Sequence, residues 1–148
     1  ITSRGADLRL RPLVGVVESA RRTKSPAEIE SMARACAVAD RALAAVVPSM
    51  VGLTEIEVRN RLEATMRELG ASGPSYETIV ATGPVNGARP HHRPTDTVIE
   101  AGHLVVIDVG ALVDGYHSDM TRTFVAGRPD TEQQRVYNNF VRAMDAYV

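Results

Sequence analysis

The fold of this chain is decided by residues 104–124, which read LVVIDVGALVDGYHSDMTRTF. The segment begins with an apolar, β-branched run, reaches the dipeptide Asp114-Gly115, and returns through Tyr116 to Phe124. An Asp-Gly pair between two strand-like runs is typical of a two-residue β-hairpin turn. The sequence therefore predicts a β-hairpin over 104–124.

Two carboxylates, Asp108 and Asp119, lie within this hairpin. Aspartate is depleted in strands, and burying its charge costs several kcal/mol unless something compensates it. If Asp114-Gly115 forms the whole loop, Asp108 opposes Thr121 and Asp119 lies diagonally on the same face. Diagonal neighbours are about 7–8 Å apart at the backbone, so the pair could bracket two divalent cations roughly 3.5–4 Å apart. Either aspartate alone has an ordinary explanation, and a loop longer by one residue would place them on opposite faces.

Helices are predicted before the hairpin. Two begin at capping boxes, Ser25-Pro26-Ala27-Glu28 and Thr54-Glu55-Ile56-Glu57, and should end near Pro48 and Gly70. Apolar residues at helical spacing predict the buried faces, with Met32 and Cys36 interpreted as core residues. These faces comprise Ile29, Met32, Cys36, Leu43 and Val47 in the first helix, and Val58, Leu62, Met66 and Leu69 in the second.

A third helix is predicted after the hairpin, capped by Asp130 and running to Val148 without a stop signal. Its apolar face consists of Val136, Phe140, Val141 and Met144. Such a face predicts a missing partner surface, because it would otherwise be exposed to water.

Residues 1–24 have a sequence pattern different from that of the rest of the chain. Leu8 and Leu10 alternate with arginines as in an edge strand, and a second short strand is expected over Val14 to Val17, before a basic linker. The chain also begins without Met. We therefore expect residues 1–24 to be the end of an upstream domain and its linker, and 25–148 to be a separate unit.

A strand over 77–82 precedes a loop over 83–96 that holds three prolines, two glycines and the dipeptide His91-His92. A loop of this length in a compact domain is usually either functional or disordered, and an ordinary solvated loop is the alternative. His91 and His92 are better candidates for ligand contact than His103 and His117. We assign His92 to substrate binding on this basis.

Composition narrows the class of protein. The chain has 148 residues, a net charge of −1 and one cysteine, Cys36. The charge favours neither nucleic acid nor an anionic membrane as a partner, and no apolar run reaches the roughly 18 residues of a membrane span. A lone cysteine fits a reducing compartment, so the cytoplasm is the expected location.

Several phrases closely resemble those of the pita-bread metallopeptidases. In the hairpin they are Val106-Ile107-Asp108-Val109-Gly110, Asp114-Gly115-Tyr116 and the run from Ser118 to Phe124. Upstream phrases are similar to the Xaa-Pro dipeptidase (prolidase) and Xaa-Pro aminopeptidase branch, namely Ser75-Tyr76, Ala81-Thr82-Gly83-Pro84, Gly87-Ala88 and Pro90-His91-His92. The resemblance covers residues 24–148, and the separation of Asp108 from Asp119 matches the family's paired ligands.

The resemblance implies an α+β fold, in which a helical layer packs on an antiparallel sheet as one half of a pita-bread domain. It implies two divalent metal ions, with Mn²⁺ expected and Co²⁺ or Zn²⁺ as alternatives. Asp108 would bind one metal or bridge both, Asp119 would bridge both, and His91 would stabilise the tetrahedral intermediate. A metal-bridging hydroxide would attack the carbonyl of an Xaa-Pro bond.

Family members take one His and two Glu ligands from a second half of the fold, which this sequence lacks. The expected partners are therefore that C-terminal half, a second copy in a homodimer, and a peptide with Pro at its second position. A fragment of an active parent, inactive alone, is the favoured interpretation. The other half could instead come from another chain, or the protein could be a non-catalytic binding module. A creatinase-type C–N hydrolase is disfavoured because it need not keep the Asp pair. Dipeptidase and aminopeptidase specificity both stay open.

Overall fold

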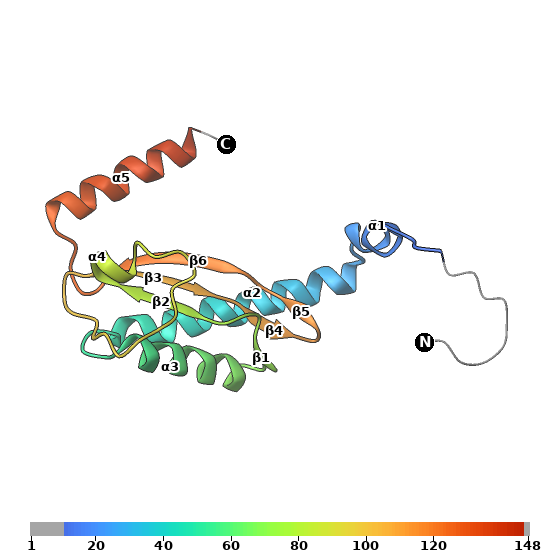
Figure 1. Ribbon diagram of the computed structural model, residues 1–148, viewed down its shortest axis with the longest axis horizontal. Coiled ribbons are helices and arrows are strands. Elements are labelled where there is room, and N and C mark those ends of the chain that lie inside the picture. The colour runs from blue at the N-terminus through green and yellow to red at the C-terminus, as the bar shows by residue number, and fades with distance from the viewer. Residues whose placement is uncertain (1–10, 147–148) are drawn as a thin grey trace.

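The computed structural model describes residues 11–146, in which two of the helices pack together on one side of the antiparallel strands (Figure 1). The helices are α1 (Val16–Arg22), α2 (Pro26–Val46), the 3₁₀ turn η1 (Val47–Ser49), α3 (Glu55–Glu68), α4 (Gly83–Asn86) and α5 (Thr131–Asp145). The strands are β1 (Gly73–Pro74), β2 (Ile79–Thr82), β3 (Leu104–Val109), β4 (Ala111–Val113), β5 (Tyr116–His117) and β6 (Met120–Val125). The α+β class is confirmed. Among the described residues, no helix combines the length and apolarity needed to cross a bilayer.

The predicted helix starts are confirmed. Both capping boxes form, since the Ser25 side chain accepts from the Glu28 amide and the Thr54 side chain accepts from the Glu57 amide. Asp130 likewise caps α5. These short-range hydrogen bonds satisfy first-turn amides that would otherwise lack partners. The continuation of α5 to Val148 concerns residues 147–148, which lie outside the described range.

The predicted buried face of α2 is largely wrong. Ile29, Met32 and Cys36 are exposed, while Leu43 is buried. The residues that face the core are mostly small: Ser31, Ala35, Val38, Ala39, Ala42, Leu43 and Val46. Small side chains let the helix axis approach the hairpin and α3 closely, and this stripe is hard to see when only large apolar residues are counted.

The strand expected over Val14 to Val17 is also wrong, because α1 begins at Val16. Glu18 lies in its first turn and Arg21 and Arg22 in its last, an order of charges that suits the helix dipole. No residue of α1 is buried. The edge strand expected at Leu8 and Leu10 lies outside the described residues.

The hairpin has the predicted register. Val113 pairs with Tyr116 across the turn, and Asp108 pairs with Thr121. The predicted hairpin forms, but its ladder is interrupted at one point, so its two parts belong to separate sheets, β1-β4-β5 and β2-β3-β6.

The interruption lies where Gly110 passes Ser118. The amide of Ala111 donates to the Ser118 hydroxyl (2.9 Å), so a side chain replaces a backbone acceptor. A Cβ atom at Gly110 would overlap the Ser118 carbonyl oxygen and would lie 2.9 Å from the Cβ of Ser75. Glycine is therefore required here by the close approach of two backbone segments.

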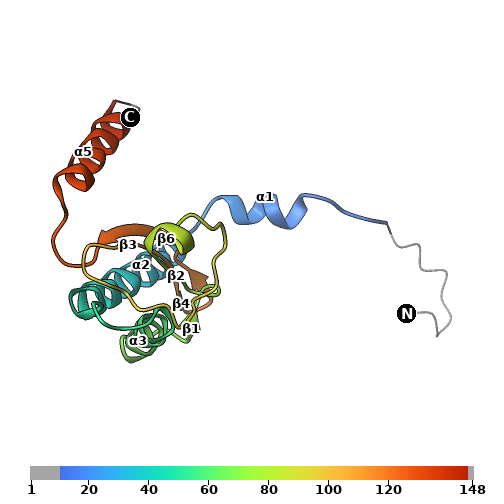
Figure 2. The same ribbon diagram turned by 60° about the vertical axis from the view of Figure 1, so that its left-hand side comes forward.

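The two faces of the sheet have different surroundings. Val105, Ile107 and Val109 of β3 are buried in the core that α2 and α3 complete. Leu104, Val106 and Asp108 alternate with them and point to the other face. Figures 1 and 2 show α5 on that other side of the sheet, opposite α3. The sheet thus presents Asp108 away from the helical layer.

Candidate metal centre and its supporting loop

Asp108 and Asp119 converge, as the register predicted. Asp108 lies in β3, and Asp119 lies in the gap between β5 and β6. The Tyr76 hydroxyl contacts Oδ1 of Asp108 at 2.8 Å and Oδ1 of Asp119 at 2.9 Å. The two carboxylate oxygens can therefore be no farther apart than the sum of those distances, about 5.7 Å. That separation is compatible with two cations roughly 3.5–4 Å apart.

Tyr76 is a functional candidate that sequence reasoning missed as an individual residue. It is half-buried, and burial together with the two carboxylates raises the pKa of its hydroxyl well above the usual range. The hydroxyl therefore keeps its proton. One O–H donates one hydrogen bond at a time, so it can satisfy only one of the two aspartates. The sequence did contain a clue to Tyr76, because the pair Ser75-Tyr76 is one of the phrases that resemble the family. That resemblance did not assign a role to Tyr76 itself.

The donor set fits divalent cations. Two carboxylates that share one donor repel each other, and a cation between them would remove that repulsion. Carboxylate oxygens are also the ligands that hard divalent ions prefer. Within residues 11–146, however, no third His, Cys, Asp or Glu joins the pair to form a cluster of three. The described part of the chain thus offers two candidate ligands, and the Tyr76 hydroxyl contacts both of them.

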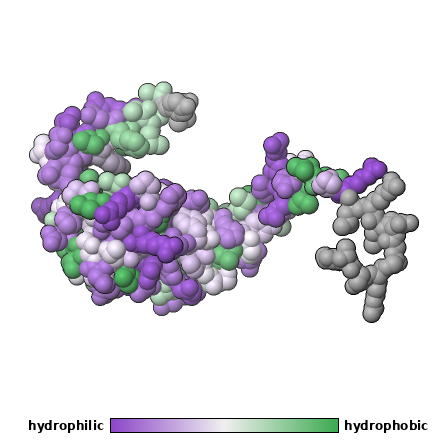
Figure 3. Space-filling model, viewed as in Figure 1, coloured by the Kyte–Doolittle hydropathy of each residue, from purple (hydrophilic) through white to green (hydrophobic). Residues whose placement is uncertain are grey.

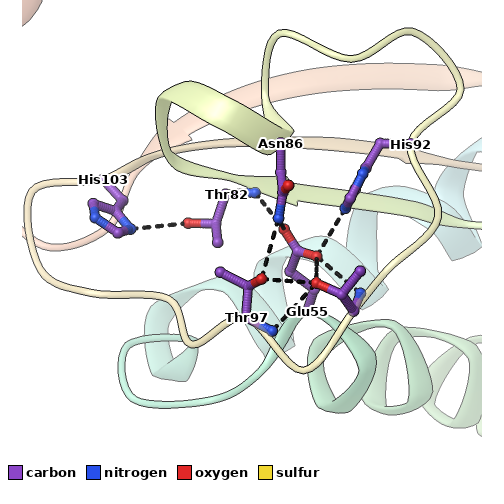
Figure 4. Close-up of polar contacts among 7 residues, drawn as sticks. Glu55, Thr82, Asn86, His92, Thr97 and His103 are labelled. Atoms are coloured by element: carbon purple, nitrogen blue, oxygen red, sulfur yellow. Dashed lines mark hydrogen bonds and ion pairs between the residues drawn. The ribbon is translucent and has the colours of Figure 1, made fainter.

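A second carboxylate, Glu55, is fully buried at the start of α3. Its Oε1 accepts from the Thr82 amide (2.7 Å) and the Asn86 side chain (3.0 Å). Its Oε2 accepts from the His92 ring nitrogen Nε2 (2.8 Å), the Thr95 amide (2.9 Å) and the Thr95 hydroxyl (2.8 Å). Figure 4 shows Asn86 and His92 pointing at this carboxylate from the loop.

The charge on Glu55 is stabilised by these donors. Burial by itself raises the pKa of a carboxyl group, but the hydrogen bonds from His92, Thr82 and Thr95 outweigh it and leave the Glu55 pKa below its usual range. The group is therefore a carboxylate at neutral pH. Sequence reasoning treated Glu55 only as part of a capping sequence, because its partners lie 27 to 40 residues away.

The two loop histidines lie in different environments. His91 is exposed and has a φ angle of 51°, an unusual left-handed conformation for a residue other than glycine. His92 is buried, and its Nε2 atom is engaged by Glu55. This position leaves little of its surface for a substrate, so substrate binding by His92 stays a prediction. His103 is partly buried beside Thr82, and His117 is exposed.

Known proteins share this arrangement of elements. The chain is 40% identical over 129 residues to the Xaa-Pro dipeptidase of Pyrococcus furiosus, covering 86% of this chain and 37% of that enzyme. The solved Xaa-Pro dipeptidase from Bacillus anthracis has a TM-score of 0.83 and 39% identity over 89% of this chain and 37% of its own. The X-Pro aminopeptidase from Thermotoga maritima has a TM-score of 0.80 and 37% identity, over 87% and 36%.

The chain therefore spans little more than a third of the length of these relatives. Its helical layer and antiparallel sheet are one half of the pita-bread fold, as the sequence predicted. The family model for metallopeptidase family M24 matches residues 30–148. With its paired aspartates on the open face of the sheet, this chain belongs to metallopeptidase family M24.

Proposed function

We propose that this chain is part of a metal-dependent peptidase that hydrolyses Xaa-Pro peptide bonds. The observation that carries the proposal is the convergence of Asp108 and Asp119 on the Tyr76 hydroxyl, in a member of family M24. The relatives named above as Xaa-Pro dipeptidases and an X-Pro aminopeptidase support the substrate class. They support both specificities, so the choice between dipeptides and longer peptides stays open.

In this proposal, Asp108 and Asp119 hold two divalent cations, with Mn²⁺ as the expected ion. When bound, such ions polarise a carbonyl group and make water more acidic. The Tyr76 hydroxyl lies within hydrogen-bonding distance of both carboxylates and donates its single proton to one of them at a time. His91, exposed on the loop, donates a hydrogen bond to the oxygen of the substrate carbonyl as negative charge develops there. The prolyl residue of the substrate follows that carbonyl.

The experiment uses the longest form of the protein that contains residues 1–148. Hydrolysis of an Xaa-Pro dipeptide and of an Xaa-Pro-Xaa tripeptide should require added Mn²⁺ and stop with a chelator. D108N and D119N should each lower kcat/KM by at least about 100-fold, because each removes a charged metal ligand. D114N is the matched control, since Asp114 is an exposed turn residue of the same hairpin. Equal activity in all three variants would refute the proposal.

The remaining half of the fold is the proposed partner. The exposed apolar residues of α5 are Val136, Tyr137, Phe140, Val141 and Met144, and Figure 3 shows apolar surface on this helix. We infer that the rest of the protein covers this face and supplies further metal ligands. Residues 1–148 alone should then bind Mn²⁺ weakly and turn over Xaa-Pro dipeptides slowly. Rapid turnover by this polypeptide would contradict the inference.

We also propose that the protein forms a homodimer and is located in the cytoplasm. In the same proposal, residues 1–24 are the end of an upstream domain and its linker. The absence of buried residues in α1 supports the last of these, because it separates that segment from the core of the unit that follows. Sedimentation of the longest form would test the dimer. A non-catalytic binding module is the alternative, and it predicts no hydrolysis with any metal.

A further inference from the structure

We propose that Glu55 is a positioning residue that holds the loop between β2 and Ile99 in one conformation and thereby sets the position of His91. The effect on His91 rests on the proposed function above. The holding of the loop does not, and it can be tested separately.

The contacts of Glu55 reach every part of this loop. Thr82 is the last residue of β2, Asn86 ends α4, His92 follows His91, and Thr95 precedes the return to the body of the protein. One carboxylate therefore joins the entry, the middle and the exit of the loop (Figure 4). Because one side chain is hydrogen-bonded to both ends of the loop, it can hold those ends together although the loop forms no β-ladder within itself.

The backbone beside Glu55 strengthens the same connection. The amide of Glu55 donates to the carbonyl of Thr97 (3.1 Å), and the amide of Ile56 donates to the carbonyl of Thr95 (3.2 Å). The returning segment is thus hydrogen-bonded to the backbone at the start of α3, beside the residue that carries the carboxylate. A small movement of this segment would break several hydrogen bonds together, which favours one conformation of the loop.

The chemistry of the cluster requires a carboxylate. All five groups that contact Glu55 act as donors, and an ionised carboxylate is a side chain that only accepts. A glutamine of the same shape would place an NH₂ group against at least one donor. The charge also strengthens each hydrogen bond in this buried setting.

His91 depends on this support. Its side chain is exposed and makes no hydrogen bond to any residue in the range 11–146, so the conformation of the loop backbone decides where the ring can lie. That backbone has the unfavourable φ angle of 51°. The preceding residue is Pro90, which restricts the chain, and the following residue is His92, which Glu55 holds. Loss of the Glu55 contacts would let the His91 backbone relax and move its ring.

The first test measures the loop itself. Hydrogen exchange of the Thr82 and Thr95 amides should become at least about 10-fold faster in E55Q than in the wild type, because both amides donate to this carboxylate. E57Q is the matched control, since Glu57 is an exposed carboxylate of the same helical turn whose hydrogen bonds within residues 11–146 are all to Thr54. Unchanged exchange in E55Q would overturn the proposal. If E55Q does not fold, T95V removes one donor and should accelerate exchange of the Thr82 amide.

The second test asks whether Glu55 acts through His91, in the longest form of the protein. E55Q should lower kcat for an Xaa-Pro dipeptide by about 10- to 100-fold while KM changes little, because a displaced catalytic group affects the chemical step. In an H91A background the same substitution should have almost no effect on kcat. An equal loss in both backgrounds would show that Glu55 does not act through His91. If H91A keeps wild-type kcat, the proposed role of His91 fails, and the exchange result still decides whether Glu55 holds the loop.

Discussion

Replacing Gly110 by alanine should disrupt the close approach of the backbone at Gly110 and Ser118, which brings Asp119 beside Asp108. The added Cβ atom would overlap the carbonyl oxygen of Ser118 and crowd the Cβ of Ser75. The Ser118 oxygen belongs to the backbone, so it cannot turn away as a flexible side chain would. One of the two segments must therefore move.

The cost can be worked from the contacts that this movement breaks. Overpacking a well-filled site costs about 1–3 kcal/mol. The displaced segment also carries hydrogen bonds from Ala111 to the Ser118 hydroxyl and from the Ser118 amide to Ala111. Each contributes roughly 0.5–1.5 kcal/mol. We expect G110A to lower the free energy of unfolding by about 3–5 kcal/mol, a large share of the stability of a typical domain.

Urea unfolding followed by circular dichroism measures this loss. G73A is the matched control, because Gly73 is also buried in a strand but a Cβ atom there meets nothing within 4 Å. It should change the free energy of unfolding by less than about 1 kcal/mol. If G110A and G73A have the same small effect, the close crossing at Gly110 is not required, and the reasoning that links it to the Asp pair is refuted.

Three further predictions concern named side chains. Y76F should weaken Mn²⁺ binding to the longest form of the protein by about 10- to 100-fold in calorimetry, because it removes the hydroxyl that contacts both aspartates and donates a hydrogen bond to one of them. D114A should lower the free energy of unfolding by about 1–2 kcal/mol relative to D114G. Both variants lose the exposed pair with Arg34, but only alanine is strained at a φ angle of 51°. The stability difference between the wild type and E55Q should be constant above about pH 5 and shrink at lower pH. The Glu55 pKa is lowered on folding, so its stabilising effect is present above the unfolded pKa and lost as the folded group takes up a proton.

Features controlled by neighbours in sequence could be predicted. The capping boxes at Ser25 and Thr54 need only residues three positions apart, and the structure confirms both. The register of the hairpin follows from the turn dipeptide, and it correctly placed Asp108 opposite Thr121. The approach of Asp108 to Asp119 followed from that register, so this part of the site was accessible from local pattern alone.

Features controlled by packing were missed. The buried stripe of α2 includes three alanines, and alanine is common on both faces of helices, so the large residues Ile29 and Met32 gave the wrong face. The break at Gly110 depends on how closely Ser118 approaches, which no pairing rule describes. The helix α1 buries nothing, and its valines are equally compatible with a strand.

The acidic residues show why chemistry cannot be assigned from residue type alone. Asp108 and Asp119 share one donor, so their charges remain largely uncompensated on an open face of the sheet. Glu55 receives five hydrogen bonds and has no capacity left for a cation. The number of donors that meet each carboxylate thus separates a candidate ligand from a structural anchor. Because those donors come from distant parts of the chain, the fold decides which acid is available for chemistry. The same fold places the fully satisfied acid beneath the loop that carries His91.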